Sequence, residues 1–268
     1  MSQPVRAVER ALDILLCFNH DELALSLTQI ADRVGMNKST VHRLLGTLES
    51  KHFIHRSKTT GLYHLSFRFV EMASLVFEDV DLRRWAQPYL QGLAAECGET
   101  VDLAVLDGAY VIYLQVVESP QRVKLAVAVG QRLPVFCTAS GKAFLAYLPD
   151  EQVTKILSGG LTQYTENTPV SLADIYEGVR RTRERGFAIS EQEYEKDINA
   201  VAAPILDADG SPVAVIAIAG PSYRLPRERM VMLGHSIRAT TDVIAREMGL
   251  ATLSAFVSNT VAAGSVRS

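Results

Sequence analysis

Cysteine is scarce in this sequence of 268 residues, and the three that are present, Cys17, Cys97 and Cys137, lie far apart. An odd and widely spaced set provides neither a disulfide framework nor the paired spacing of a metal site, and it suits a reducing compartment. We therefore expect a cytoplasmic protein that needs no metal ion or other cofactor.

Long hydrophobic runs are also absent. No stretch approaches the roughly 18 to 20 apolar residues that a membrane-spanning helix needs. The first sixteen residues carry acids within their apolar pattern and lack a small-residue cleavage site, so we expect no signal peptide. Hydrophobic residues make up 48% and charged residues 21%, which excludes a wholly disordered or fibrous chain. The length allows one large or two ordinary domains.

Acidic residues are few in one part of the chain, although the net charge is −3. Residues 1–74 hold nine Lys or Arg and seven Asp or Glu, whereas the remainder holds eighteen and twenty-three. Between Arg33 and Arg68, Glu49 is the only acidic residue. A basic stretch on an acidic chain indicates a surface that meets a polyanion, and a merely solvated surface is the alternative that composition leaves open.

Apolar residues at helical spacing predict three short helices in this basic part, over residues 6–18, 27–34 and 38–51. Ser26 or Thr28 can cap the second helix, and Gly35 is expected to adopt a left-handed conformation in the turn that follows. Two short helices joined by a three- to four-residue turn that contains Gly form a helix-turn-helix.

The polar face of the third predicted helix contains no acidic residue from Lys38 to Leu48. Short donors and acceptors followed by cations are what base edges and phosphates in a major groove require. We therefore predict DNA contacts from this helix and the residues just before it: Thr28, Asn37, Lys38, Ser39, Thr40, His42, Arg43 and Thr47.

Two short β-prone segments, residues 53–56 and 62–65, flank a turn that contains Gly61 and predict a hairpin. A basic hairpin directly after a recognition helix is typical of a wing, which reaches the neighbouring phosphate backbone or minor groove. We place further DNA contacts at Arg56, Lys58 and Tyr63. A plain hairpin that completes a small core is compatible with the same pattern.

After the wing, residues 67–77 predict a linker helix, and residues 81–97 predict a second helix that ends at Gly98. The apolar period then changes to two, which predicts strands over 101–106, 110–117, 123–127, 198–206 and 213–219. Helices are predicted over 144–148, 151–157, 171–185 and 227–248. Strands paired by hairpins with intervening helices indicate an α+β domain on an antiparallel sheet. Residues 251–268 are small and polar, and we expect a disordered tail.

Several segments resemble, in this order, the isocitrate lyase regulator (IclR-type) family of bacterial transcription factors over about residues 5–249. They are VRAVERALDILLCF, LTQIADRVGMNKSTVHRLLGTLE, GLYHLSFRFVEMA, LPVFCTASGKAFLAYL and RGFAISEQEYEKDINAVAAPILDADGSPVAVIAIAGPSYRL. The resemblance implies a winged helix-turn-helix domain (1–66), a linker helix (67–80) and a GAF-like effector-binding domain (81–250). It also implies double-stranded operator DNA and a small-molecule effector as partners, a homodimer or dimer of dimers, and action on neighbouring catabolic genes.

Catalytic interpretations of the segment around Ser140 are less well supported. Phe136 stands where the first Gly of a phosphate-binding loop belongs, and Ala143 replaces its Ser or Thr. A nucleophilic Cys137 or Ser140 needs a base, but five of the six histidines lie in the DNA-binding part and the sixth in the last helix. We expect no enzyme. A thiol enzyme or redox sensor using Cys137 is the alternative, and an interaction module that has lost DNA binding is a second.

The same segment suits ligand binding, because small residues at a helix start let a ligand approach free backbone N–H groups and the helix dipole favours a carboxylate there. The alternative is that Ala139 and Gly141 merely allow close packing. The resemblance implies effector contacts at Phe136, Thr138, Ala139, Ser140, Ser190, Glu191, Glu193, Tyr194, Ala200, Ala217 and Ala219.

The chain departs from relatives at a few of these positions. Ala217 and Ala219 replace serines found in some relatives that bind small acids, and Ala200 replaces a cysteine. We therefore predict a pocket with few donors, for an effector with a polar or anionic head near Thr138–Ser140 and an apolar or aromatic body. In the wing, His64 stands where relatives often carry arginine, which weakens the case for that phosphate contact.

Overall fold

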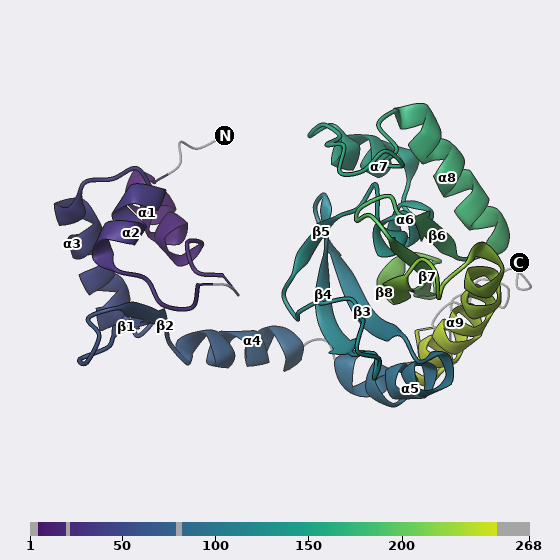
Figure 1. Cartoon of the computed structure of the whole chain (residues 1–268), viewed down its shortest axis with the longest axis horizontal. Helices are drawn as coiled ribbons and strands as arrows, with labels where there is room; N and C mark the ends of the chain where they lie inside the picture. The colour runs from purple at the N-terminus through teal and green to yellow at the C-terminus, as the bar shows by residue number, and fades with distance from the viewer. Residues whose placement is uncertain (1–4, 20–21, 79–81, 251–268) are drawn as a thin grey trace, which may run out of the picture. The chain divides into compact units, whose positions relative to one another are not determined.

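The computed structural model describes residues 5–19, 22–78 and 82–250. The chain forms two compact units, residues 1–80 and 81–268, whose elements are labelled in Figure 1. Each unit has a hydrophobic core of its own.

The N-terminal unit is a three-helix bundle followed by a hairpin and a further helix. Its elements are α1 (Arg6–Leu15), α2 (Leu27–Arg33), α3 (Lys38–Ser50), β1 (Ile54–Arg56), β2 (Tyr63–Leu65) and α4 (Arg68–Glu78). Its core contains one or more apolar side chains from each helix of the bundle, including Ile14, Ile30 and Leu45. The predicted helix-turn-helix and hairpin are therefore present, with ends within a few residues of those expected.

Local chemistry explains the turn between α2 and α3. Ser26, not Thr28, caps α2: its hydroxyl accepts from the Gln29 N–H, and the Gln29 side chain accepts from the Ser26 N–H at 2.9 Å. Gly35 has φ of +62°, a left-handed conformation that glycine adopts without a side-chain clash. Asn37 then caps α3. Together these residues set where the recognition helix begins.

The C-terminal unit is built on one antiparallel sheet. Its elements are α5 (Leu82–Cys97), β3 (Thr100–Asp107), β4 (Tyr110–Val117), β5 (Arg132–Pro134), α6 (Ala139–Leu145), α7 (Asp150–Leu157), α8 (Leu172–Arg185), β6 (Ala188–Glu191), β7 (Ile198–Leu206), β8 (Pro212–Pro221) and α9 (Arg227–Glu247). The strand order is β5-β4-β3-β8-β7-β6, and every neighbouring pair is antiparallel. This is the α+β architecture that the alternating pattern predicts.

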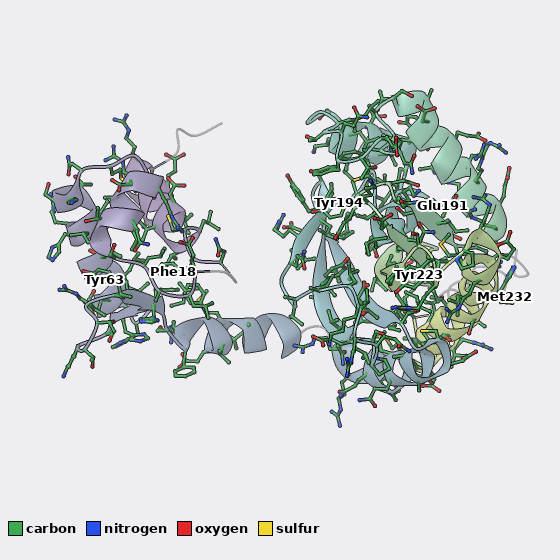
Figure 2. The ribbon with its side chains drawn as sticks, viewed as in Figure 1. Phe18, Tyr63, Glu191, Tyr194, Tyr223 and Met232 are labelled. Atoms are coloured by element: carbon green, nitrogen blue, oxygen red, sulfur yellow. The ribbon has the colours of Figure 1, made fainter. Side chains whose placement is uncertain are left out.

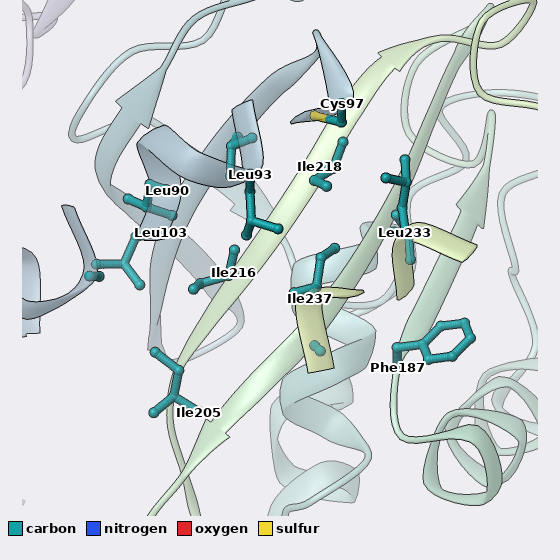
Figure 3. Packing of buried hydrophobic residues seen from close by; sticks show 14 of the residues in the cluster. Leu90, Leu93, Cys97, Leu103, Phe187, Ile205, Ile216, Ile218, Leu233 and Ile237 are labelled. Atoms are coloured by element: carbon teal, nitrogen blue, oxygen red, sulfur yellow. The ribbon is translucent and has the colours of Figure 1, made fainter. Parts of the chain in front are cut away.

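Helices cover both faces of this sheet. On one face, Leu90 and Leu93 of α5 and Ile237 of α9 pack over Ile216 and Ile218 of β8 (Figure 3). On the other face, α6 packs on β6, β7 and β8, and α7 and α8 complete a second cluster of buried side chains. Successive side chains along the central strands β3, β7 and β8 therefore point mostly to opposite faces of the sheet and pack into these two clusters.

The predicted strand over residues 123–127 is wrong. These residues form no strand, and the edge of the sheet is β5, at Arg132–Pro134. Their apolar alternation has another cause, since Leu125 and Val127 line a cavity while Val123 is exposed. The predicted helix over 144–148 is displaced, because α6 begins at Ala139, and the short strand β6 was not predicted.

Candidate DNA-binding surface and effector cavity

The exposed face of α3 is the candidate DNA-binding surface of the N-terminal unit. Val41, Leu45 and Leu48 turn toward the core and are buried. The predicted contacts lie elsewhere on the helix or beside it: Thr28, Asn37, Lys38, Ser39, His42, Arg43 and Thr47 are exposed, and Thr40 is half-buried. The structure therefore brings these polar side chains to one accessible region.

The start of α3 is held by its own polar side chains. Asn37 Oδ1 accepts hydrogen bonds from the Thr40 N–H and the Ser39 hydroxyl, both at 2.9 Å. Within the described ranges, no acidic side chain forms an ion pair with Lys38 or Arg43. These two cations are therefore available for phosphates or base edges, whereas Asn37 and Ser39 also position the helix.

The wing contributes fewer free groups than expected. Arg56 Nε donates to the Gly61 carbonyl at 3.0 Å, and its guanidinium lies 5.6 Å from the centroid of the Tyr63 ring. Lys58 is exposed in the turn. Tyr63 is only 4% exposed and pairs through its backbone with Leu25, so it is a core residue that supports the wing (Figure 2). The expected DNA contact at Tyr63 is corrected on this ground.

Two helices of the same unit expose apolar side chains in series. On and beside α1 these are Val5, Val8, Leu12 and Leu16, and on and beside α4 they are Phe67, Val70, Met72 and Leu75. Phe67 is 85% exposed. Exposed apolar side chains are costly in water, so the apolar face of α1 and the exposed apolar side chains around α4 are candidates for contact with another chain.

A cavity that is open in part to solvent lies in the C-terminal unit on the α6 side of the sheet. It brings together most of the predicted effector residues: Thr138, Ala139, Ser140, Ser190, Tyr194, Ala200, Ala217 and Ala219. The other lining residues are Asp102, Tyr113, Leu125, Ala126, Val127, Gln131, Leu133, Cys137, Glu195 and Ile198.

Small side chains on β7 and β8 form the floor of this cavity. Ala200 pairs with Ala219, and Ala217 pairs on its other side with Asp102 of β3. Paired residues of an antiparallel ladder point to the same face, so the methyl groups and the Asp102 carboxyl share one surface. The alanines leave room above them that larger residues would fill.

The start of α6 offers unused backbone donors to the cavity. Thr138 caps the helix: its hydroxyl donates to the Pro134 carbonyl at 2.8 Å and accepts from the Gly141 N–H at 3.1 Å. In the described part of the chain, the N–H groups of Ala139 and Ser140 have no acceptor. Gly141 has a packing role, since a Cβ there would lie 2.1 Å from the Val135 carbonyl oxygen.

Three predicted effector residues lie outside this cavity. Glu191 and Glu193 line a second cavity of about 780 Å³, where Glu191 pairs with Arg227 and Glu193 with Lys142. Phe136 lines a third cavity with Tyr164. Gln192, between the two glutamates, has φ of +58°, and Figure 2 shows Glu191 apart from Tyr194. The effector contacts predicted at Phe136, Glu191 and Glu193 stay predictions, since none of the three lines the first cavity.

Asp102 also lines the cavity, although the sequence analysis did not predict it there. Among the lining residues that were not predicted, it has the largest chemical consequence. Its side chain is 1% exposed, and its Oδ1 atom has no hydrogen-bond partner among the described residues. Burial raises the pKa of this carboxyl to about 8. An isolated acid within the apolar run Val101–Val105 was the available signal, because the period of two places it on the same face as Ala104.

The geometry does not support thiol chemistry at Cys137. Burial, with a contribution from the Glu193 charge, raises the pKa of its thiol to about 12, and the thiol form is a poor nucleophile. His235, the histidine of α9, packs edge-on against Phe187, in the helix layer that covers the opposite face of the sheet. No histidine is therefore positioned beside this cysteine within the described ranges.

The described residues show neither a membrane-spanning helix nor a metal-binding cluster. No helix there has the length and apolar character to cross a membrane. No three His, Cys, Asp or Glu side chains in those ranges lie close enough together to hold a metal ion.

Comparison with known proteins gives consistent matches along the whole chain. The family model described as IclR helix-turn-helix domain matches residues 7–58, and the one described as bacterial transcriptional regulator IclR C-terminal matches residues 74–246. The chain is 30% identical over 248 residues to the HTH-type transcriptional regulator XynR of Escherichia coli, covering 91% of this chain and 98% of XynR. It is 32% identical over 243 residues to the transcriptional repressor IclR of the same organism, covering 89% of each.

Solved structures show the same fold. An IclR homologue from Microbacterium hydrocarbonoxydans, complexed with 4-hydroxybenzoate, superposes with a TM-score of 0.78 at 23% identity, covering 90% of this chain and 99% of that one.

Proposed function

The chain belongs to the IclR family of bacterial transcriptional regulators, and we propose that a small organic effector, bound in the cavity beside α6, controls its affinity for operator DNA. It is a DNA-binding transcription regulator. The observation that carries the proposal is a cavity with unused backbone donors at one wall and alanines on its floor. Such a concave, mainly apolar site with a few polar groups is typical of small-molecule binding.

In this proposal α3 enters the major groove of operator DNA. Lys38 and Arg43 bind phosphates or base edges, and Ser39, Thr40, His42 and Thr47 complete the contacts along the helix. Lys58 extends them to the backbone beside the groove. Thr28 and Asn37 lie next to the helix start, and Arg56 acts mainly by holding the wing turn.

Dimerisation is a further part of the proposal. A single winged helix reads too few base pairs for useful specificity, whereas a two-fold dimer repeats the contact about one helical turn away. The exposed apolar side chains of α1 and α4 provide surfaces that pairing of two chains would cover. A dimer or a dimer of dimers follows, without a metal ion or cofactor.

The effector class follows from the cavity. An acid group would accept from the Ala139 and Ser140 N–H groups, and an apolar or aromatic body would lie over Ala200, Ala217 and Ala219. A homologue of this fold is complexed with 4-hydroxybenzoate, which is consistent with an aromatic acid. The regulated genes would be neighbouring catabolic genes, the protein would act in the cytoplasm, and no reaction is catalysed.

Fluorescence anisotropy with labelled DNA from upstream of the regulator's own gene tests this function. Candidate aromatic acids are titrated into the complex of wild type with DNA, and we expect one of them to change the apparent Kd for DNA. Ala200→Phe, which fills the cavity, should bind DNA as wild type does but no longer respond. Met232→Phe, at an exposed position of α9, is the control for a phenylalanine introduced outside the cavity. A normal response from a folded Ala200→Phe variant would place the effector elsewhere.

A further inference from the structure

The buried carboxyl group of Asp102 has an oxygen, Oδ1, without a hydrogen-bond partner among the described residues. Asp102 lies in the interior of β3, between β4 and β8, with its side chain on the wall of the effector cavity. Its Oδ1 atom is buried and accepts no hydrogen bond from the described residues. Buried polar groups in folded proteins are nearly always hydrogen-bonded, so an orphan carboxyl beside a cavity indicates that a ligand supplies its partner.

The surroundings of Asp102 contain no positive charge. Facing the same cavity are Tyr113 from β4, Cys137 before α6, and Tyr194 and Glu195 from the loop before β7. No Lys, Arg or His is among the lining residues of this cavity. Burial, and then the charge of Asp102, raise the pKa of Tyr113 well above its ordinary value, so its phenol stays protonated. Because no cation lines the cavity, the protonated form of Asp102 is favoured.

Space is available directly above the carboxyl. Ala217 is the cross-strand partner of Asp102 on β8, and its methyl group does not fill the volume over the pair. The unused N–H groups of Ala139 and Ser140 border the same cavity. The cavity thus has two polar regions of opposite character: backbone donors at the start of α6 and a carboxyl on the sheet.

We propose that Asp102 recognises a hydrogen-bond donor of the effector, a hydroxyl or an amine, and that the effector therefore carries this donor in addition to its acid head. The proposal rests on the proposed function, because it assumes that the effector occupies this cavity. It names a specificity determinant: compounds that are apolar at this end would leave the buried carboxyl without a partner and bind less tightly.

The two donor types differ in their proton balance. A hydroxyl donates to Asp102 while the carboxyl keeps its proton, so no proton is exchanged with solvent. An ammonium group pairs with the carboxylate, so Asp102 releases one proton to the buffer on binding. Calorimetric titration in two buffers of different ionisation enthalpy separates these cases, because only the second adds a buffer-dependent heat.

The test compares benzoate, 3- and 4-hydroxybenzoate and 4-(aminomethyl)benzoate as probes of full-length wild type, Asp102→Asn and Asp102→Leu. Wild type should bind at least one donor-bearing probe about tenfold or more tighter than benzoate. Asp102→Leu should reduce this ratio to near one, whereas Asp102→Asn, which keeps a hydrogen-bonding group, should retain part of the preference for hydroxyl.

An unchanged ratio in Asp102→Leu, equal binding of benzoate by wild type, or binding of none of the probes would overturn the donor proposal. Release of DNA by a compound without a donor would also overturn it, yet would leave the proposed function intact. An effector response that survives Ala200→Phe would instead overturn the proposed function itself. The two failures are therefore distinguishable.

Discussion

Lys142 of α6 donates to Glu193 in the loop after β6, and both side chains are largely buried. Burial lowers the pKa of Lys142, and the Glu193 charge opposes this shift. The pair joins the helix that borders the effector cavity to the segment that carries Tyr194. Glu193 therefore acts as a structural partner of Lys142 and not as an effector ligand in the first cavity.

Removing one member of this pair should destabilise the C-terminal unit. Lys142→Met leaves Glu193 buried without its partner, and breaking a buried pair in this way costs about 3 to 5 kcal/mol. Lys142→Met combined with Glu193→Gln should recover much of the loss, because no buried charge remains. Urea denaturation of the single and double variants measures both values. Equal destabilisation of the two would show that charge pairing is not the cause.

Loss of the free cations of α3 should weaken DNA binding without unfolding the protein. We expect Arg43→Ala and Lys38→Ala each to cost about 1 to 3 kcal/mol of binding if they contact base edges. A phosphate contact would also reduce the salt slope by about one. Gel-shift titration at two salt concentrations, with circular dichroism, provides the measurement. Lys155→Ala, an exposed position of α7, is the matched control, and unchanged affinity in both α3 variants would place the recognition surface elsewhere.

A charge among the exposed apolar side chains of α4 should dissociate the dimer. Val70→Lys and Leu75→Lys introduce an ammonium group where we propose that two chains meet, and a central contact of this kind is worth about 2 kcal/mol or more. Light scattering at micromolar concentration should detect monomers of these variants. Met232→Lys on α9 adds the same charge at another exposed site and should remain dimeric. A monomeric wild type that binds a palindrome tightly would contradict this prediction.

Serine at the cavity floor should have different effects at its two positions. Ala219→Ser adds a buried hydroxyl opposite Thr100, whose own hydroxyl already accepts from the Ser119 N–H. A buried hydroxyl that stays unpaired costs about 1 to 3 kcal/mol, or roughly five- to hundredfold in Kd for an apolar effector. Ala217→Ser lies opposite Asp102, so its hydroxyl can pair with the carboxyl and the loss should be smaller. Calorimetric titration of wild type and both variants with aromatic acids, glyoxylate and pyruvate measures these changes in Kd. Binding of only the two small acids by wild type would refute the apolar-floor argument.

The stability of the protein should fall between about pH 4 and pH 8 through Asp102. Its pKa is about 8 in the folded chain and about 3.9 when unfolded, so in this range the folded state binds the extra proton. Stability then decreases with rising pH, by at most about 1.4 kcal/mol per unit. Asp102→Asn should show a flatter profile and should be more stable than wild type at pH 8. Parallel denaturation curves of both proteins from pH 5 to pH 8 measure the effect, and identical profiles would contradict it.

The sequence predicted those elements whose position is set by nearby residues, such as a turn residue or a helical spacing of apolar side chains. Helical spacing located α2 and α3, Gly35 marked the turn, and the run Asp207–Gly210 marked the turn between β7 and β8. Side chains whose role depends on distant segments were not predictable in the same way. Residues 123–127 alternate like a strand but have no ladder partner among the described residues, and Leu125, Ala126 and Val127 line the cavity instead.

The candidate effector site was predicted in part. Thr138–Ser140 and the alanines of β7 and β8 do border one cavity, because the small side chains that identified them also make its space. The sequence did not show that Glu191 and Glu193 line a different cavity from Tyr194, because β6 ends at Glu191 and strand alternation no longer applies beyond it. Asp102 was missed because its significance depends on the absence of a partner in the folded chain.

The coupling between the cavity and DNA binding is the central claim, and a closed thermodynamic cycle tests it most directly. The Kd of an effector found in the anisotropy screen is measured by calorimetry for the free regulator and for the regulator saturated with operator DNA. The account predicts that the two values differ by the same factor by which saturating effector changes the Kd for DNA. Equal effector Kd values in the two states would contradict it.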